Sequence, residues 1–183
     1  MKLKTDLNTY NNNNYTSGNF IARVIWYFIN AIFFKSSFFP SYSLKRAILK
    51  LFGADVGFDV IIKPNVNIKY PWKLKVGDYV WIGEGVWIDN LDFISIGSHS
   101  CISQGALLLC GNHDYSKSSF DLMVKPIVFE EGVWIGAKSV VCPGVIIGSH
   151  GVLSAGSVLS NDIKPYEIYR GNPAEKIKNR TIK

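Results

Sequence analysis

Residues 76–88 read VGDYVWIGEGVWI, and in this stretch an aliphatic residue recurs every six positions, at Val76, Ile82 and Ile88. A period of six matches neither an amphipathic α-helix nor an alternating strand, and it is typical of the hexapeptide repeats of a parallel β-helix. We therefore predict one short strand and one turn per hexad, with the first and fifth residues facing a shared core. The first positions of the other hexads are Val56, Ile62, Ile68, Ile96, Ile102, Leu108, Phe129, Ile135, Val141, Ile147, Leu153 and Leu159.

The spacing of the hexads also gives the coils and one interruption. Val56, Val76 and Ile96 lie twenty residues apart, so each early coil holds three hexads and two extra residues. Residues 114–128 fit no hexad, and we predict that they form an external loop that leaves the β-helix directly after His113. Loops on a rigid scaffold often carry function, so this loop is where we expect the chemistry.

Four segments follow from these patterns. We expect a polar, loosely attached tail at 1–19, which is rich in asparagine. The segment 20–53 predicts two helices, an aromatic one that ends near Pro40 and an amphipathic one from Ser43 to Phe52. The mainly β domain, a left-handed parallel β-helix, covers 54–163, and a C-terminal segment covers 164–183.

Composition narrows the possible functions. The net charge of +6 in 183 residues fits a phosphorylated ligand, and no dense basic stripe interleaved with aromatics indicates nucleic acid. Three scattered cysteines argue against a disulfide framework, so we expect a cytoplasmic protein. The apolar stretch from Val24 to Phe34 is shorter than the ~20 residues of a spanning helix. It either packs on the body of the protein or makes a peripheral contact with the inner face of the membrane.

His113 is the candidate general base, because an imidazole is the usual group for removing a proton from a hydroxyl near neutral pH. Asn112 and Asp114 flank it and are candidates for orienting its ring. His99 and His150 both fall at the fourth position of a hexad, two coils apart on one wall, and should point outward. Metal ligands must converge on one point, so we expect no metal site.

Other chemistry-bearing residues have two interpretations each. Cys110 precedes His113 by three residues and is either a nucleophile or, as we favour, a small apolar wall residue. The outward positions of Trp81, Trp87 and Trp134 indicate a protein interface or a ligand cleft, unless the N-terminal helices cover one of them. The basic C-terminal segment either binds phosphates or is simply solvated.

Together these motifs resemble a known family, the hexapeptide-repeat O-acetyltransferases, which include the galactoside and maltose acetyltransferases. The resemblance rests on the hexad array and on three motifs, Gly111–Asp114, Trp134–Ala137 and Gly171–Ala174. The branch it resembles more closely is that of the colanic acid biosynthesis acetyltransferases. The additional matching segments are Lys63–Pro64, Ile68–Trp72, Trp87–Asn90, Cys101–Gly105 and Leu51–Ala54.

The resemblance implies a homotrimer with active sites between neighbouring subunits, His113 as the base, and acetyl-CoA as the acetyl donor in a groove between two solenoids. By position, Asp89 and Asn90 would bind the acceptor. The residues that it places against coenzyme A are Trp134, Ala137, Ala155, Ser160 and Lys178.

The predicted function is transfer of an acetyl group from acetyl-CoA to a sugar hydroxyl of a capsule or exopolysaccharide precursor. One alternative is an N-acetyltransferase that acts on an amino-sugar nucleotide and uses the same scaffold. Two others are a metal-dependent hydratase and a non-catalytic β-helix subunit. The acceptor itself would be a small saccharide, and nucleic acid is not an expected partner.

Overall fold

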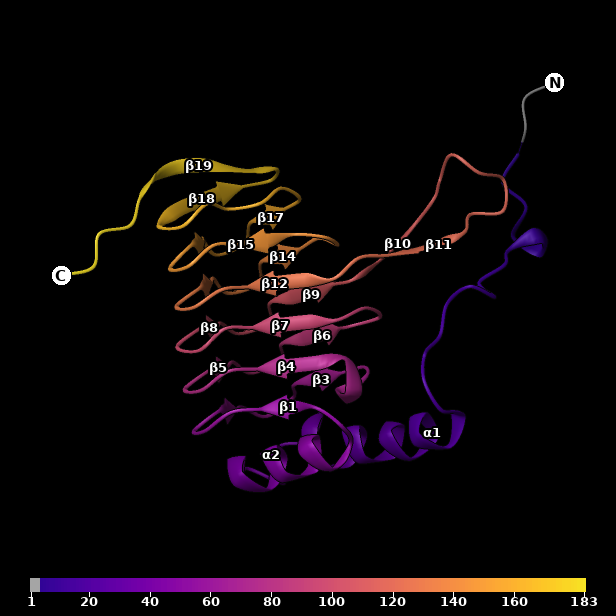
Figure 1. Cartoon of the computed structure of the whole chain (residues 1–183), viewed down its shortest axis with the longest axis horizontal. Coiled ribbons are helices and arrows are strands. Elements are labelled where there is room, and N and C mark those ends of the chain that lie inside the picture. The colour runs from indigo at the N-terminus through magenta and orange to yellow at the C-terminus, as the bar shows by residue number, and fades with distance from the viewer. Residues whose placement is uncertain (1–3) are drawn as a thin grey trace.

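The computed structural model describes residues 4–183, and it shows a three-sided parallel β-helix with helices at one end (Figure 1). On each side the strands of successive coils pair in parallel to form a sheet, and each full coil takes one strand from each sheet. Sheet A contains β1 (Asp55–Val56), β4 (Leu74–Val76), β7 (Ile94–Ile96), β12 (Ile127–Phe129) and β15 (Ile146–Ile147).

The other two sheets complete the coils. Sheet B contains β2 (Ile61–Ile62), β5 (Trp81–Ile82), β8 (Cys101–Ile102), β13 (Trp134–Ile135), β16 (Val152–Leu153), β18 (Glu167–Gly171) and β19 (Ala174–Asn179). Sheet C contains β3 (Asn67–Ile68), β6 (Trp87–Asp89), β9 (Leu107–Leu109), β14 (Val140–Val141) and β17 (Val158–Leu159). Coils 1 to 5 therefore begin at β1, β4, β7, β12 and β15, and the β18–β19 hairpin covers the end of coil 5.

The core is the stack of first-position residues that the hexads predict. In sheet B, Ile62, Ile82 and Ile102 are in register on successive coils, and all three are buried. The glycine after the aliphatic residue lets neighbouring coils approach, because a Cβ on Gly136 would lie 2.3 Å from the backbone nitrogen of Ala155. This periodic burial confirms the β-helix predicted from the six-residue spacing.

Two helices close the open edge of coil 1. The first is α1 (Phe20–Ile29), which continues as a π-helical turn η2 (Asn30–Phe34), and the second is α2 (Tyr42–Leu51). The first helix therefore ends at Phe34 rather than near Pro40, and the Ser36 hydroxyl accepts a hydrogen bond from the Phe38 amide at 3.1 Å in the turn that follows. No helix in the described range 4–183 is long and apolar enough to span a membrane.

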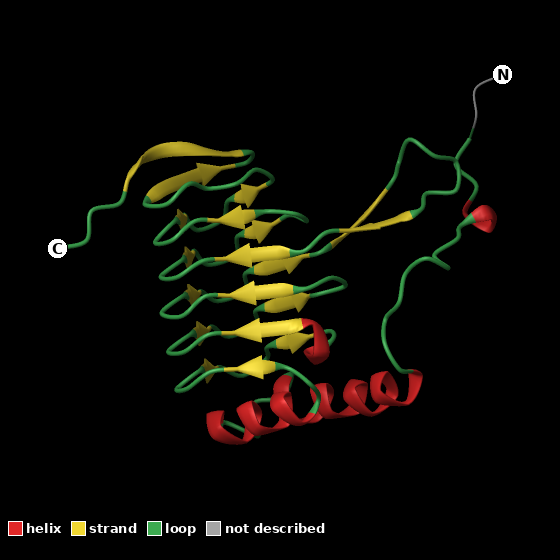
Figure 2. Ribbon diagram, in the orientation of Figure 1, coloured by secondary structure: helices red, strands yellow, loops and turns green. Residues whose placement is uncertain are grey.

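The external loop is an antiparallel arm that begins earlier than the hexads indicate. Strand β10 (Gly111–His113) pairs with β11 (Leu122–Val124), and the chain rejoins sheet A at β12. The excursion thus covers residues 111–126, and His113 lies on the arm rather than at the end of a coil. The hexad pattern misplaced both ends because Gly111–His113 forms its backbone pairs with β11 and not with a neighbouring coil. Figure 2 shows this arm projecting from the stack.

The N-terminal tail is attached to the body and the arm, contrary to the expectation of a loose segment. The Asp6 amide donates to the Ser118 carbonyl on the arm at 2.8 Å. The Tyr15 hydroxyl donates to the Leu91 carbonyl at 2.9 Å, and Lys73 Nζ donates to the Thr16 carbonyl at 3.0 Å. These contacts hold the tail, including a short 3-10 turn at Leu7–Thr9, between α1 and the arm (Figure 1). A second 3-10 turn, Pro71–Lys73, follows β3.

Candidate active site

The imidazole of His113 is held by the other strand of the arm. Its Nδ1 lies 2.9 Å from the backbone carbonyl of Phe120, and its ring stacks on the Phe120 ring with centroids 4.4 Å apart. A carbonyl can only accept a hydrogen bond, so Nδ1 must carry the proton in this contact. The neutral ring therefore has its lone pair on Nε2, which is the form that a general base needs.

Asn112 and Asp114 do not orient the imidazole, which corrects the role expected of them. The Asn112 side chain accepts a hydrogen bond from the His113 amide at 2.8 Å, and Asp114 accepts from the Ser116 hydroxyl at 2.5 Å. Hydrogen bonds from Ser116 also hold the pKa of the Asp114 carboxyl below its ordinary value. Both residues shape the arm backbone, while the orienting group is the Phe120 carbonyl. Sequence reasoning missed it because a backbone oxygen carries no residue-type signal.

His113 faces a cavity of about 460 Å³ that three segments enclose. The arm supplies His113, the corner between sheets C and A supplies Lys69 and Tyr70, and the N-terminal region supplies Tyr15 and Arg23. Another tail residue, Tyr10, places its ring 6.1 Å from that of His113. The tail residues were not predicted as site residues, because the polar composition of that segment gives no indication of where it docks. Aromatic rings beside cationic groups suit a sugar with an anionic substituent.

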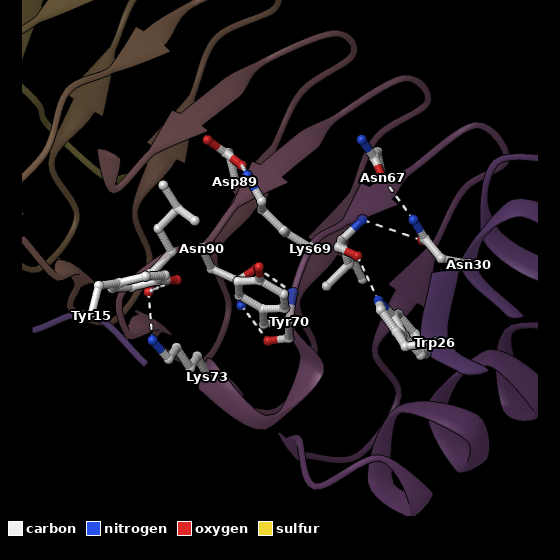
Figure 3. A network of polar contacts seen from close by, with 11 residues as sticks. Tyr15, Trp26, Asn30, Asn67, Lys69, Tyr70, Lys73, Asp89 and Asn90 are labelled. Carbon is white, nitrogen blue, oxygen red and sulfur yellow. Dashed lines mark hydrogen bonds and ion pairs between the residues drawn. The ribbon is translucent and has the colours of Figure 1, made fainter. Parts of the chain in front are cut away.

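The two predicted acceptor residues lie one coil below the arm and differ in their surroundings (Figure 3). Asn90 is fully buried, and its side chain accepts from the Tyr70 amide at 3.0 Å and donates to the Tyr70 carbonyl at 2.5 Å. It therefore fixes the position of Tyr70 in the cavity wall. Asp89 Oδ1 lies 2.9 Å from Lys69 Nζ as an ion pair, but among the described residues it accepts no well-aligned hydrogen bond.

A polar network connects the corner between sheets C and A to the N-terminal tail. Lys73 Nζ donates to the Leu91 carbonyl at 2.6 Å and lies 4.7 Å from the centroid of the Tyr15 ring. Burial raises the pKa of Tyr15, with further contributions from Tyr70 and Asp89, and burial lowers the pKa of Lys73. Tyr15 therefore stays a neutral hydrogen-bond donor, which keeps the tail docked against the cavity.

The residues predicted to contact coenzyme A are on the surface but are not all together. Trp134 faces outward on sheet B, where its Nε1 donates to the Ser103 hydroxyl at 3.0 Å. Ala137 and Ala155 occupy the same corner, between sheets B and C, in coils 4 and 5. Ser160 follows β17 at the corner between sheets C and A, and Lys178 lies on β19 opposite Ile168. Within one chain, the arm leaves the corner between sheets C and A, whereas Ala137 lies at the corner between sheets B and C. These two parts of the predicted site are therefore on different edges of the β-helix.

The cysteines and tryptophans occupy the expected surroundings. Cys110 is buried, and burial raises the pKa of its thiol to about 12, so it is neutral near pH 7. This agrees with its interpretation as a small apolar residue rather than a nucleophile. The side chains that face outward on the walls, as the hexads predict, include Trp81, Trp87 and Trp134.

The remaining two histidines are separate from the cavity. His99 stacks on Tyr79 with ring centroids 5.1 Å apart, and His150 lies 4.8 Å from Tyr166. They belong to coils 3 and 5, as their hexad positions predict. Between residues 4 and 183, no three histidine, cysteine or acidic side chains are grouped so that they could hold a metal ion.

Comparisons with known proteins define the class of this chain. The family model "Bacterial transferase hexapeptide (six repeats)" matches residues 126–161. The protein named "Putative colanic acid biosynthesis acetyltransferase WcaF" from Escherichia coli (strain K12) is 39% identical over 166 residues, which cover 91% of each chain. The galactoside O-acetyltransferase of the same strain is 28% identical over 143 residues, covering 76% of this chain and 70% of that protein.

The fold agrees with these relatives. A hexapeptide-repeat-containing acetyltransferase from Vibrio cholerae O1 biovar eltor, solved in complex with acetyl coenzyme A, superposes with a TM-score of 0.79. It is 23% identical, and the match covers 88% of each chain. The stacked parallel sheets thus form the left-handed β-helix that the chain was predicted to adopt. The chain belongs to the hexapeptide-repeat acetyltransferase family, with a relative in the colanic acid biosynthesis branch that matches it over nearly its whole length.

Proposed function

We propose that this acetyltransferase moves the acetyl group of acetyl-CoA to a hydroxyl of a saccharide, with His113 as the general base. The observation that carries the proposal is the contact between His113 Nδ1 and the Phe120 carbonyl, which places the lone pair of the neutral ring on Nε2. His113 lines a cavity of about 460 Å³. A base needs that tautomer before it can accept a proton from a hydroxyl.

The reaction balances with one proton carried by His113. Nε2 takes the proton from the acceptor hydroxyl, and the acceptor oxygen forms a bond to the thioester carbonyl carbon. The carbon–sulfur bond then breaks, and the imidazolium returns the proton to the departing thiolate. The Phe120 carbonyl accepts from Nδ1–H throughout, so it also stabilises the positive charge that the ring carries during transfer.

The acetyl donor follows from the family and from the surface of coils 4 and 5. We place the donor along the corner formed by Ala137, which is half-buried, and Ala155, which is exposed, with Trp134 beside it on sheet B. Ser160 and Lys178 are the further contacts we assign. The acetyl-CoA complex of the Vibrio cholerae neighbour supports this choice of donor.

The assembly we propose is a homotrimer, because the site is incomplete in one chain. The arm with His113 leaves the corner between sheets C and A, and Ala137 and Ala155 lie at the corner between sheets B and C. When a second copy packs beside the arm, its corner with Ala137 and Ala155 comes close to the His113 of the first copy. Three copies in such a head-to-tail arrangement form a closed ring, and the three sites between them are identical.

The acceptor we propose is a saccharide used in making a capsule or exopolysaccharide. Support comes from the colanic acid relative and from the cavity, in which tyrosines lie beside Lys69 and Arg23. Asp89 takes part through its ion pair with Lys69, and Asn90 takes part by holding Tyr70. The domain that carries this chemistry is 54–163, with 20–53 as its helical cap. The N-terminal segment contributes Tyr10, Asn12, Tyr15 and Ser17 to the wall of the cavity.

The test compares two histidine variants on a panel of oligosaccharides, nucleotide sugars and amino sugars with acetyl-CoA. His113→Asn should lower turnover by about 10²–10⁴-fold, whereas His99→Asn, at an exposed histidine outside the cavity, should match the unaltered protein. Product mass and thiol release are the readouts, and circular dichroism checks the fold. Near-normal turnover by His113→Asn would refute the base, and acetylation of amines alone would identify an N-acetyltransferase.

A further inference from the structure

Helix α1 presents an apolar face that nothing in the described chain covers. Its inward side chains, Trp26, Asn30 and Phe34, pack on coil 1, where Trp26 Nε1 donates to the Ile68 carbonyl at 2.8 Å (Figure 3). The opposite side contains only apolar and aromatic residues and no charge. The exposed members of this face are Phe20, Ile21, Val24, Ile25, Tyr27, Phe28 and Ile32.

The apolar face continues onto the second helix. Leu51 at the end of α2 is 81% exposed, and Phe38 in the connecting turn is 90% exposed. Between the helices, Ile21 and Ile25 line a groove of about 580 Å³ together with Leu51 and Trp72. A surface of this extent is larger than the scattered apolar residues normally found on a monomer, and it marks a docking site.

The charge around this surface identifies its partner. Residues 20–53 contain five basic residues, Arg23, Lys35, Lys45, Arg46 and Lys50, and no acidic ones. Lys45 and Arg46 are used inside the protein, where they donate to backbone carbonyls of coil 1, but Lys35 and Lys50 are exposed. An apolar, aromatic helix face with basic residues at its margins is the pattern of a helix that lies in the interface of an anionic bilayer.

A second cavity links this surface to the active site. It has a volume of about 490 Å³, lies between α1 and coil 1, and includes Lys35 and Tyr27 in its lining. It shares Arg23, Lys69 and Tyr70 with the cavity that contains His113. Docking on α1 would therefore bring the residues shared by the two cavities close to the bilayer surface.

We propose that the exposed face of α1, with Leu51 and Phe38, docks the protein on the surface of an anionic phospholipid bilayer. The aromatic and aliphatic side chains enter the headgroup boundary, and Lys35 and Lys50 meet the phosphates. Residues 20–53 carry exposed lysines and no acidic residue, which favours anionic headgroups over a protein surface as the partner. This docking does not depend on which acceptor the enzyme acetylates.

Flotation of the full-length protein with vesicles tests the proposal. The protein should float with vesicles of phosphatidylcholine and phosphatidylglycerol, and it should float less with phosphatidylcholine alone or in high salt. The double variant Ile25→Glu and Phe28→Glu should reduce the bound fraction at least about tenfold. The matched control is Ile177→Glu, which alters an exposed isoleucine on β19 at the far end of the solenoid.

A variant without the two lysine charges separates the electrostatic contribution to vesicle binding from that of the apolar side chains. Lys35→Gln and Lys50→Gln together should weaken binding to the anionic vesicles by about tenfold or more, and leave the weak binding to neutral vesicles unchanged. Three results would overturn the proposal. One is an unaltered protein that stays at the bottom of the gradient with anionic vesicles. Another is an Ile25→Glu and Phe28→Glu double variant that floats as well as the unaltered protein. The third is an Ile25→Glu and Phe28→Glu double variant whose molar mass in light scattering shows fewer subunits than the unaltered protein. This result would make the face an interface between copies of the chain.

Discussion

His113 depends on a residue that no catalytic motif contains. Phe120 supplies the carbonyl that binds Nδ1 and the ring that stacks on the imidazole, and its own φ of 53° lies in the left-handed region. This backbone conformation is uncommon for a bulky residue, and here it places both the carbonyl and the ring against His113. The geometry of the proposed base is thus set by the turn of the arm as much as by the histidine.

Shortening Phe120 should therefore impair chemistry more than binding. Phe120→Ala removes the stacked ring, so we expect kcat to fall by about tenfold to a hundredfold while KM changes little. Phe120→Tyr keeps the ring and should restore kcat. Steady-state kinetics of both variants, with Tyr115→Ala as an exposed control on the same arm, distinguish positioning from a general loss of structure. A Phe120→Ala enzyme with unchanged kcat would show that stacking does not matter.

Cys110 gives a prediction for stability at high pH. Its pKa is 9.0 in the free side chain and about 12 in the folded protein, where burial favours the neutral thiol. Between these values the unfolded chain releases its proton first, so the free energy of unfolding falls as pH rises from about 9 to about 12. This thiol can contribute a slope of at most about 1.4 kcal/mol per pH unit. Urea denaturation across that window should show a shallower fall for Cys110→Ala, and equal slopes would contradict the argument.

At the level of elements, α2 acts as a cap for an exposed sheet edge. A β-helix leaves unpaired backbone groups at its first coil, and such edges invite pairing with other chains. Here Lys45 Nζ donates to the carbonyls of Ile62 and Lys63 at 3.2 and 3.1 Å, and Arg46 donates to that of Val60 at 3.0 Å. Burial lowers the pKa of Lys45, which is a cost of using a cation for this purpose.

Replacing Lys45 should show how much the cap contributes to the free energy of unfolding. Lys45→Met keeps the apolar stem but leaves one buried and one part-buried carbonyl without this donor, so the free energy of unfolding should fall by about 1–3 kcal/mol. Lys50→Met, at an exposed position on the same helix, should change it by less than about 0.5 kcal/mol. Chemical denaturation of both variants measures the difference. Equal stabilities would mean that water satisfies the carbonyls.

At the level of the whole molecule, the proposed site shared between copies predicts that two inactive variants complement each other. His113→Asn removes the base, and Ala155→Trp should block the donor corner, so each variant alone should be inactive. In trimers mixed from equal amounts of both, some sites combine an intact arm with an intact corner. Random mixing should restore about a quarter of the activity. Co-expression followed by acetyl-transfer assays provides the measurement, and a mixture that stays inactive would place the whole site in one chain.

The sequence by itself determined the β-helix and its register, and it identified His113 as the candidate base. The six-residue period fixes which side chains face inward, because burial of one aliphatic stack on the next leaves little freedom of register. Residues such as Ile82 and Ile135 could therefore be assigned to the core from spacing alone. The histidine was identified from its motif and its position beside the interruption of the hexads.

Only the tertiary structure decided how the site is built. The tautomer of His113 depends on the Phe120 carbonyl, and the cavity wall depends on the docking of Tyr15 against Leu91, seventy-six residues away. The role of Asn90 depends likewise on its hydrogen bonds to the Tyr70 backbone. These contacts have no periodicity and use backbone groups that every residue has. A repeating pattern can predict a solenoid, but contacts between distant, non-repeating segments are determined only when the chain is folded.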